Sequence, residues 1–162
     1  QAMRDADTSV IYPAAHWARG LNIGGRTDWY IPARDELELC WRNLKPVTNN
    51  NYVTADRPTA ASFNYANNGS YGGTANTHGT NNNSSPTGAT YTSSVPAQTA
   101  ATAFRTGGAE AYEFGSAYYW SSSDYNASIA WLQYWGSSHP GHQGSNGKAQ
   151  TYRVRAVRRS VV

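Results

Sequence analysis

The stretch AWLQYW, residues 130–135, constrains the fold of this 162-residue chain more than any other. Its alternation predicts a β-strand with Trp131, Gln133 and Trp135 on one face. Leu132 and Tyr134 then point to the opposite face. Two tryptophans on one face require a deep core beneath the strand, and the 13% of aromatic residues can fill it.

Residues 33–44 carry the clearest helical pattern. Leu37, Cys40, Trp41 and Leu44 fall at i, i+3, i+4 and i+7, which predicts one apolar stripe, and Pro46 ends the helix. Because Cys40 lies on that stripe, we interpret it as a core thiol and not as a nucleophile. As the single cysteine, it excludes an internal disulfide and a cysteine-based zinc cluster.

Two further short helices are expected. Residues 13–19 start with a proline and end before Gly20, and their pattern turns Trp17 and Ala18 inward. Residues 95–108 predict a third helix, whose inward residues would be Ala97, Ala100, Ala101 and Phe104. Between the first two helices, TDWYIP is typical of a short strand, with Trp29 and Ile31 on one face.

Three strand patterns follow late in the chain: SAYYWSSS, IAWLQYW and TYRVRAV. Early helices and late strands predict an α+β domain with a small antiparallel sheet. Residues 48–94, rich in Asn, Gly, Ser and Thr, have no regular period and predict a long irregular insertion. We expect residues 1–162 to form a single domain, cut from the C-terminal part of a longer chain because they begin with Gln1.

The charge pattern bears on the partners. Only 14% of residues are charged, which is typical of secreted and surface-exposed β-rich proteins. The net charge of +3 is concentrated near the C-terminus, where we expect four arginines to tie the last strand to the rest of the domain: Arg153, Arg155, Arg158 and Arg159. We therefore predict no nucleic-acid binding, and the sequence has no apolar run that could insert into a membrane.

Catalytic and metal sites are not expected. Asp35 and Glu38 suit the positive end of a helix, and the serines of WSSSD lack a nucleophile elbow. His139 and His142 have no Asp, Glu or Cys close by in the sequence, so they make at most half of a metal site. We predict a protein that is not an enzyme and needs neither a metal nor a cofactor.

Residues 136–148 follow the firmest strand with small, polar and turn-forming residues. Ser, Gly, Asn, His and Tyr provide adaptable hydrogen bonds and aromatic contacts, as they do in antibody loops. An ordinary solvent loop has the same composition, so the residues alone leave both interpretations open.

Four strings in order, GGRTDWYIPARDELELC, YYWSSSDY, AWLQYW and RVRAVRRS, resemble the C-terminal domain family of the Legionella collagen-like adhesin. They are also similar to the variable ligand-binding proteins that retroelements diversify in phages and bacteria. The resemblance covers the chain from about Tyr12, apart from the insertion. It implies a C-type-lectin-like fold. It also implies a recognition domain, and the related formylglycine-generating oxidases are a poorer match.

The resemblance also implies a division of residues in the last strands and loops. Trp131, Gln133 and Trp135 match fixed scaffold positions. The matching diversified, ligand-binding positions are Tyr125, Asn126, Ser128, Ile129, Leu132, Tyr134, His139, His142, Gly144, Ser145, Asn146, Gly147, Gln150 and Tyr152. Tyr134 and Tyr152 would act as aromatic anchors. Family members often have a Ser or Thr directly before the long helix, where this chain has Ala33. The N-terminal cap of that helix is therefore in question, whereas the fold is not.

The function that follows is receptor binding outside the cell, on a virion tail fibre or a bacterial surface. The partner would be a host cell-surface protein or glycan. Two alternatives stay open: a bacterial adhesin for sulfated glycans, and a structural cap that forms a homotrimer without binding a receptor. The preferred reading requires Leu132 and Tyr134 to be exposed, whereas alternation alone equally allows a sheet covered on both faces.

Overall fold

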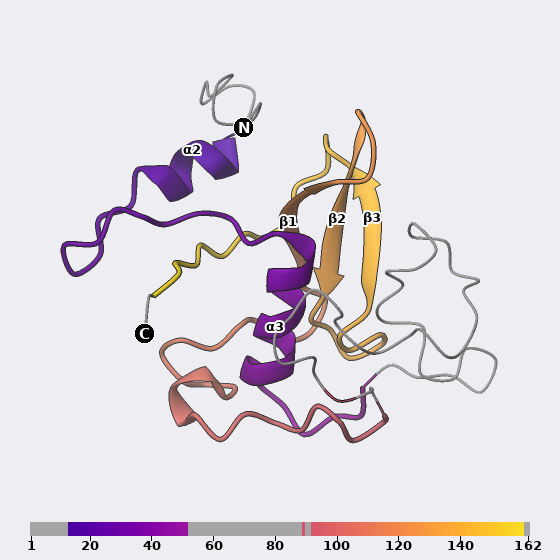
Figure 1. Cartoon of the computed structure of the whole chain (residues 1–162). Coiled ribbons are helices and arrows are strands. Elements are labelled where there is room, and N and C mark those ends of the chain that lie inside the picture. Colours follow the sequence, from indigo (N-terminus) through magenta and orange to yellow (C-terminus); the bar gives the residue numbers. More distant parts are fainter. Residues whose placement is uncertain (1–12, 52–88, 90–91, 161–162) are drawn as a thin grey trace.

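The computed structural model describes residues 13–51, 89 and 92–160, and this part of the chain forms a small α+β fold. Its helices are α2 (Pro13–Arg19) and α3 (Arg34–Leu44), with a 3₁₀ turn, η2, at Thr102–Phe104. Its strands are β1 (Tyr118–Asp124), β2 (Ile129–Tyr134) and β3 (Gln143–Gly147). They form one antiparallel sheet in the order β1-β2-β3, and α3 packs along it (Figure 1).

Helix α3 forms as the apolar stripe predicts, although Ala33 has no side-chain oxygen to cap it. Two side chains replace the missing cap. A Glu36 carboxylate oxygen accepts from the Ala33 backbone N–H at 2.9 Å, and Ser123 Oγ in β1 accepts from the Arg34 N–H at 3.0 Å. The start of α3 is thereby also fixed to the sheet.

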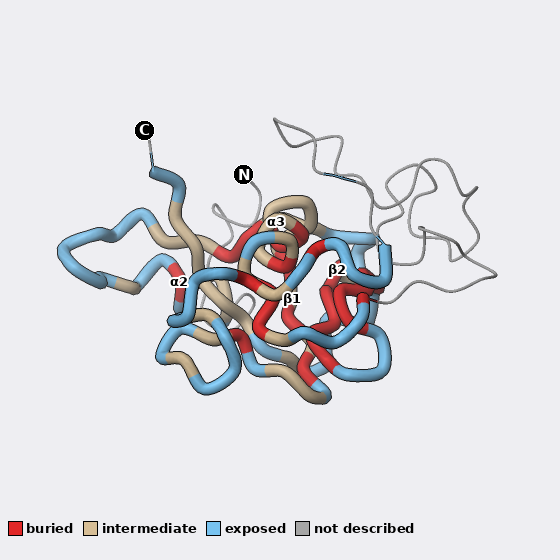
Figure 2. The backbone as a smooth tube through the Cα atoms, turned by 90° about the horizontal axis from the view of Figure 1, so that it is seen from below, coloured by how far each residue is buried: buried red, intermediate tan, exposed pale blue. Residues whose placement is uncertain are grey.

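The core lies between α3 and the sheet and is mainly aromatic. Trp135 is fully buried; its ring stacks on Tyr112 at 3.8 Å and meets Trp41 of α3 edge-on at 4.9 Å. Leu37, Ala117 and Tyr119 complete this cluster. Figure 2 shows the buried residues concentrated in α3, β1 and β2. Trp131, Gln133 and Trp135, which the alternation places on the core face of the predicted strand, are all buried.

The third strand is not where the sequence placed it. TYRVRAV forms no full strand. Arg153 makes a parallel bridge beside Tyr119 of β1, and Val157 makes an antiparallel bridge with Tyr30. The third strand is β3, which pairs with β2 inside the stretch that we had interpreted as a loop. Small residues such as Gly144 suit this position because they stand in register with the bulky Leu132.

Two further local predictions were wrong. The segment TDWYIP contains only the single bridge at Tyr30. In residues 95–108 only η2 is helical, and Ala97, Ala100 and Ala101 are exposed. The backbone here bonds to the end of α3 instead: Thr99 N–H donates to Lys45 O at 2.9 Å and Thr106 N–H to Pro46 O at 3.1 Å. These tertiary bonds replace the helical ladder.

Helix α2 has the predicted bounds, but only part of its predicted inner face is buried. Ala18 is fully buried, whereas 47% of Trp17 is exposed. Ile23, in the loop after α2, is 53% exposed. Helix α2 and this loop stand to one side of the sheet (Figure 1). None of the described helices is long and apolar enough to cross a membrane.

The insertion predicted for residues 48–94 lies mostly outside the described residues, but its two ends are described. Asn51 N–H donates to Ser93 O at 2.7 Å, and Asn51 Nδ2 donates to Pro96 O at 3.0 Å. Lys45 Nζ reaches the same Pro96 oxygen at 3.2 Å. We call Lys45, Asn51 and Pro96 the neck, because they hold the start and the end of the insertion side by side.

The four terminal arginines bind the body of the domain, as predicted. Each makes an ion pair with a carboxylate far away in the sequence: Arg153 with Glu113, Arg155 with Glu110, Arg158 with Asp28, and Arg159 with Glu36. The Arg155 guanidinium also lies over the Tyr112 ring, 4.8 Å from its centroid. The ion pairs therefore fasten the C-terminal segment to the segment before β1, to the segment before α3 and to α3 itself.

Candidate functional site

The predicted ligand-binding residues gather mainly at one end of the sheet. We call this region the sheet tip and define it as residues 124–129, between β1 and β2, with residues 145–150, at the end of β3 and beyond it. Two loops meet there because β2 pairs with both neighbours, and Ile129 stands opposite Gly147. The Lys148 N–H donates to Ser128 O at 2.9 Å and joins the loops directly.

Backbone hydrogen bonds hold the first loop in one conformation. Asn126 Oδ1 accepts from the N–H groups of Ser128 and Ile129, both at 2.9 Å. The Tyr125 N–H donates to Ile129 O, also at 2.9 Å. An Asn side chain that binds the backbone two residues on is a common way to fix a tight turn. The loop is therefore ordered by its own residues and by β2.

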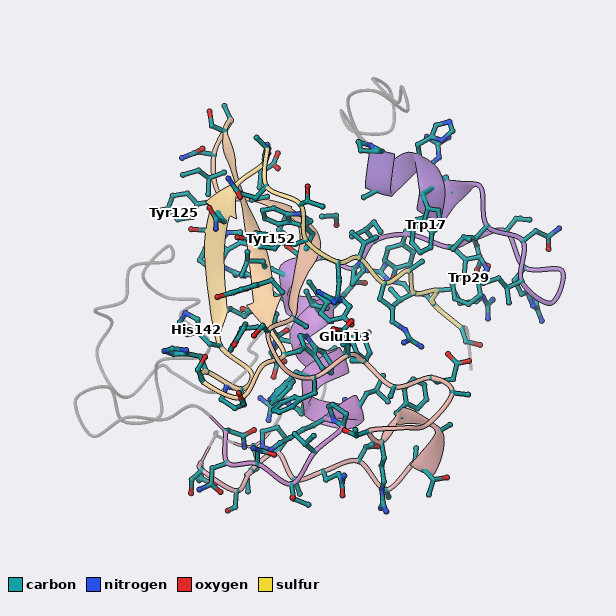
Figure 3. All side chains as sticks on the ribbon, turned by 180° about the vertical axis from the view of Figure 1, so that it is seen from behind. Trp17, Trp29, Glu113, Tyr125, His142 and Tyr152 are labelled. Carbon is teal, nitrogen blue, oxygen red and sulfur yellow. The ribbon has the colours of Figure 1, made fainter. Side chains whose placement is uncertain are left out.

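Two tyrosines give the tip its aromatic contact area. Tyr125 is 41% exposed, and its ring meets the buried Trp131 edge-on at 5.5 Å. Tyr152 is half-buried on the flank of the tip, 5.1 Å from the Trp120 ring, and its hydroxyl accepts from Asn146 Nδ2 at 2.7 Å. Figure 3 shows Tyr125 and Tyr152 on the upper half of the sheet. Each tyrosine thus combines an exposed part with a fixed support.

The charges at the tip compensate one another. Lys148 Nζ lies 2.8 Å from a carboxylate oxygen of Asp124. Next to the tip, Arg34 pairs with Asp35 at 2.9 Å and lies over the Trp131 ring at 4.9 Å. The sequence interpretation did not include Asp124 or Lys148, although each directly adjoins a predicted residue. These pairs favour a ligand without a strong net charge.

Nine predicted residues lie at the tip or on its flank: Tyr125, Asn126, Ser128, Ile129, Ser145, Asn146, Gly147, Gln150 and Tyr152. The remaining five, Leu132, Tyr134, His139, His142 and Gly144, lie in the middle of the sheet or in the turn at its other end. Five strand steps separate Ile129 from Tyr134, which is about 17 Å. A small ligand therefore cannot contact Ile129 and Tyr134 at once.

The predicted exposure of Leu132 and Tyr134 is wrong. Leu132 is 4% exposed and Tyr134 is 6% exposed. The Tyr134 hydroxyl donates to Gly115 O at 3.2 Å and accepts from Ser138 Oγ at 3.0 Å, and its ring lies 4.6 Å from Tyr118. The sheet is therefore covered on both faces at β2. Tyr134 cannot serve as the exposed anchor that we expected.

His142 and Gly144 are also buried, whereas His139 is exposed. Of the predicted residues away from the tip, only His139 is open to solvent. The residues predicted to form one binding face therefore do not form one exposed surface. Most of those on β2 and near the start of β3 are buried, and the exposed ones are His139 and residues of the sheet tip.

The residues considered for catalysis have structural partners. Burial raises the pKa of the Cys40 thiol, so the thiolate that a nucleophile requires is disfavoured. Glu38 is fully buried and accepts from Arg42 Nε at 2.9 Å. In the WSSSD stretch, Ser121 Oγ donates to Trp131 O at 2.9 Å. Glu38 and Ser121 thus have structural hydrogen-bond roles.

No protein-family model, no curated protein sequence and no solved structure matches this chain. The resemblance to C-type-lectin-like adhesins thus stays a prediction from the four sequence strings.

Proposed function

We propose that this domain is a receptor- or ligand-binding domain of the adhesin type, with a C-type-lectin-like fold, and that it binds through the sheet tip. The partner would be a protein or glycan on the surface of a host cell. The domain would then act outside the cell, on a phage tail fibre or on a bacterial surface. One observation supports the proposal: nine of the fourteen residues that the resemblance implies to be ligand-binding lie together at the tip or on its flank.

Physical reasons support a binding role for the tip. Its loops carry Tyr, Asn, Ser and Gln, which offer contact area and hydrogen bonds at low conformational cost. Tyr125 is held from below by Trp131, and the loop around it is fixed by Asn126. A partner would meet a preorganised surface, so little entropy is lost when it binds.

The test compares two exposed aromatic residues that lie in different parts of the domain. We expect Tyr125→Ala to weaken binding at least about tenfold, because interface energy concentrates in a few aromatic side chains. Trp17→Ala, on α2, is the matched control and should bind like the wild type. Labelled domain is titrated onto a panel of bacterial cells and a glycan array, with thermal unfolding measured for each variant.

Three outcomes contradict this proposal. In the first, the Tyr125 variant binds as tightly as the wild type. In the second, the Trp17 variant loses binding to the same extent. In the third, the wild-type domain retains no member of either panel.

The homotrimeric cap is the second candidate, and one observation favours it. Trp17 and Ile23, 47% and 53% exposed, lie close together in the sequence on α2 and the loop after it. Exposed apolar side chains of this size often belong to an interface between subunits. Sedimentation of the isolated domain tests this: a trimer that dissociates on Trp17→Ala supports the cap, and a monomer excludes it.

Sulfated glycans are the least favoured ligand. Lys148 at the tip is already paired with Asp124, so a sulfate group would have to displace a carboxylate. Heparin retention that falls with salt, and that Lys148→Gln abolishes, is the result that would restore this alternative.

A further inference from the structure

The end of the C-terminal segment is held to the domain by few contacts. Val157 pairs with Tyr30 through two backbone hydrogen bonds, with N···O distances of 2.8 and 2.9 Å. The next two residues are arginines that each pair with a carboxylate: Arg158 with Asp28, and Arg159 with Glu36. Figure 1 shows this segment running beside the chain that leads into α3. One bridge and two partly exposed ion pairs therefore attach residues 157–159.

Glu36 contacts both the start of α3 and the C-terminal segment. Its Oε2 accepts from the Ala33 backbone N–H at 2.9 Å. Its Oε1 accepts from the Tyr30 hydroxyl at 2.9 Å and from Arg159 Nη2 at 2.6 Å. The Arg159 guanidinium also lies 5.8 Å from the centroid of the Tyr30 ring. A single carboxylate thus joins the helix cap to the last residues of the segment.

All of these contacts favour the ionised form of Glu36. Each partner donates a hydrogen bond to a carboxylate oxygen, and such bonds are strongest when the acceptor carries a charge. Burial by itself raises the pKa of the Glu36 carboxyl, but the hydrogen bonds from Ala33, Arg159 and Tyr30 outweigh burial. They hold this pKa below its ordinary value of 4.5.

We propose that Glu36 is an acid-sensitive switch: its protonation detaches the end of the C-terminal segment from residue 157 onward and removes the charged cap of α3 in the same step. Because the pKa of Glu36 is lowered in the folded state, the ionised carboxylate stabilises the attached segment above pH 4.5. This stabilisation is lost as the pH falls through the folded-state pKa. Asp28 acts in the same direction, because its hydrogen bond with Arg158 lowers its pKa below 3.8.

The other titratable groups around Glu36 keep their charge state in this acidic range. Burial and the neighbouring Glu36 raise the pKa of Tyr30 above 10.0. Burial also raises the pKa of the Cys40 thiol, which senses the Glu36 charge from within α3. Arg159 stays positively charged, since its hydrogen bond with Glu36 raises its pKa further. The two carboxylates, Glu36 and Asp28, are therefore the groups that change at this end of the segment.

The earlier part of the C-terminal segment has contacts that do not need an ionised carboxylate. The Arg153 N–H donates to Tyr118 O at 3.0 Å, and the Arg155 guanidinium lies 4.8 Å from the Tyr112 ring centroid. Detachment therefore stops between residues 155 and 157. Tyr152 and the sheet tip stay in place, so the switch goes beyond the proposed binding function and does not depend on it.

A pH titration of the full chain, followed in ¹H–¹⁵N correlation spectra from pH 7 to pH 3, tests the switch. We expect the amide resonances of Ala33 and Val157 to shift with a shared midpoint below pH 4.5. Amide exchange of Val157, corrected for the intrinsic rate at each pH, should accelerate at least about tenfold at the acidic end. The Trp135 N–H, which donates to Ala117 O in the core, should keep its protection.

Two variants test whether the helix cap and the segment are coupled through Glu36. Arg159→Gln changes a side chain that is 80% exposed, so the domain should fold normally. The midpoint of the Ala33 shift should then rise toward 4.5, because the carboxylate has lost a charged partner. Arg153→Gln removes another exposed C-terminal ion pair, that with Glu113, and is the matched control. It should leave the Ala33 midpoint unchanged.

Three results would overturn the switch. The first is separate midpoints for Ala33 and Val157. The second is an Ala33 midpoint that stays the same in Arg159→Gln. The third is loss of protection at Trp135 together with Val157, because acid would then unfold the whole domain and not detach one segment.

Discussion

The two ends of the sheet differ in how deeply their aromatic side chains are buried. Near α3 and the end of β2, Trp41, Trp135 and Tyr112 interlock at ring separations of 3.8 and 4.9 Å and are almost fully buried. At the tip, Tyr125 has one buried neighbour and 41% of its surface in solvent. The difference shows how one sheet can bury aromatic rings at one end and present a partly exposed tyrosine at the other.

The largest expected effect is in the aromatic core. Trp135→Ala should lower the free energy of unfolding by about 3–5 kcal/mol, because it removes a fully buried ring and leaves a cavity between Trp41 and Tyr112. Urea unfolding followed by tryptophan fluorescence or circular dichroism measures the change. A loss below about 1 kcal/mol would show that this end of the sheet is not the core that the comparison assumes.

Two tyrosines, one buried in the sheet and one exposed at the tip, allow a direct comparison of stability. Tyr134→Ala should destabilise by about 2–4 kcal/mol, because Tyr134 is buried and its hydroxyl bridges Gly115 and Ser138. Tyr125→Ala should change stability by less than about 1 kcal/mol. Equal effects in urea unfolding would mean that the tip is as important for folding as the interior.

The neck provides a prediction on pH dependence. Burial lowers the pKa of Lys45 from 10.5 to about 8. Because the folded-state pKa is below the unfolded value, the unfolded chain binds more protons between these values, and stability rises with pH there. Lys45→Met removes this pH-dependent contribution to the free energy of unfolding. From pH 8 to pH 10 the wild type should gain on the order of 2 kcal/mol relative to the variant.

Urea unfolding of both proteins at the two pH values measures this difference. Parallel stability profiles would show that Lys45 is not desolvated at the neck. Lys148→Met is the matched control, because Lys148 is a partly exposed lysine outside the neck.

The smallest effects are expected in the C-terminal ion pairs. Arg155→Gln should cost about 1 kcal/mol, because its guanidinium lies over the buried Tyr112 and pairs with Glu110 at 2.6 Å. Arg153→Gln should cost only a few tenths, because its pair with Glu113 is mostly exposed. Thermal unfolding at low and high salt ranks the two, and the reverse order would contradict this account of the C-terminal segment.

Much of the fold follows from local sequence patterns. The stripe from Leu37 to Leu44 predicts α3 to within one residue, and the alternation around Trp131 predicts β2. The missing cap at Ala33 did not prevent the helix, because Glu36 and Ser123 supply oxygen atoms from elsewhere. Ser123 could not be identified from the sequence near α3, since 89 residues separate it from Arg34.

The candidate site was predicted less well than the fold. The family resemblance pointed to residues of the tip such as Tyr125 and Asn146, and composition indicated adaptable side chains in residues 136–148. The sequence could not show that Tyr134 is covered, since strand alternation gives the direction of a side chain and not what lies above it. β3 was missed for a related reason: QGSNG has little strand propensity, and only its partner β2 makes it a strand.

The sequence by itself determined α2 and α3, two of the strands and the aromatic composition of the core, because these depend on periodicity and side-chain volume within one segment. Only the tertiary structure decided which aromatic residues remain exposed and which loops meet at the tip. The physical reason is that burial and proximity are properties of pairs of segments, and no single segment contains the information about its neighbour.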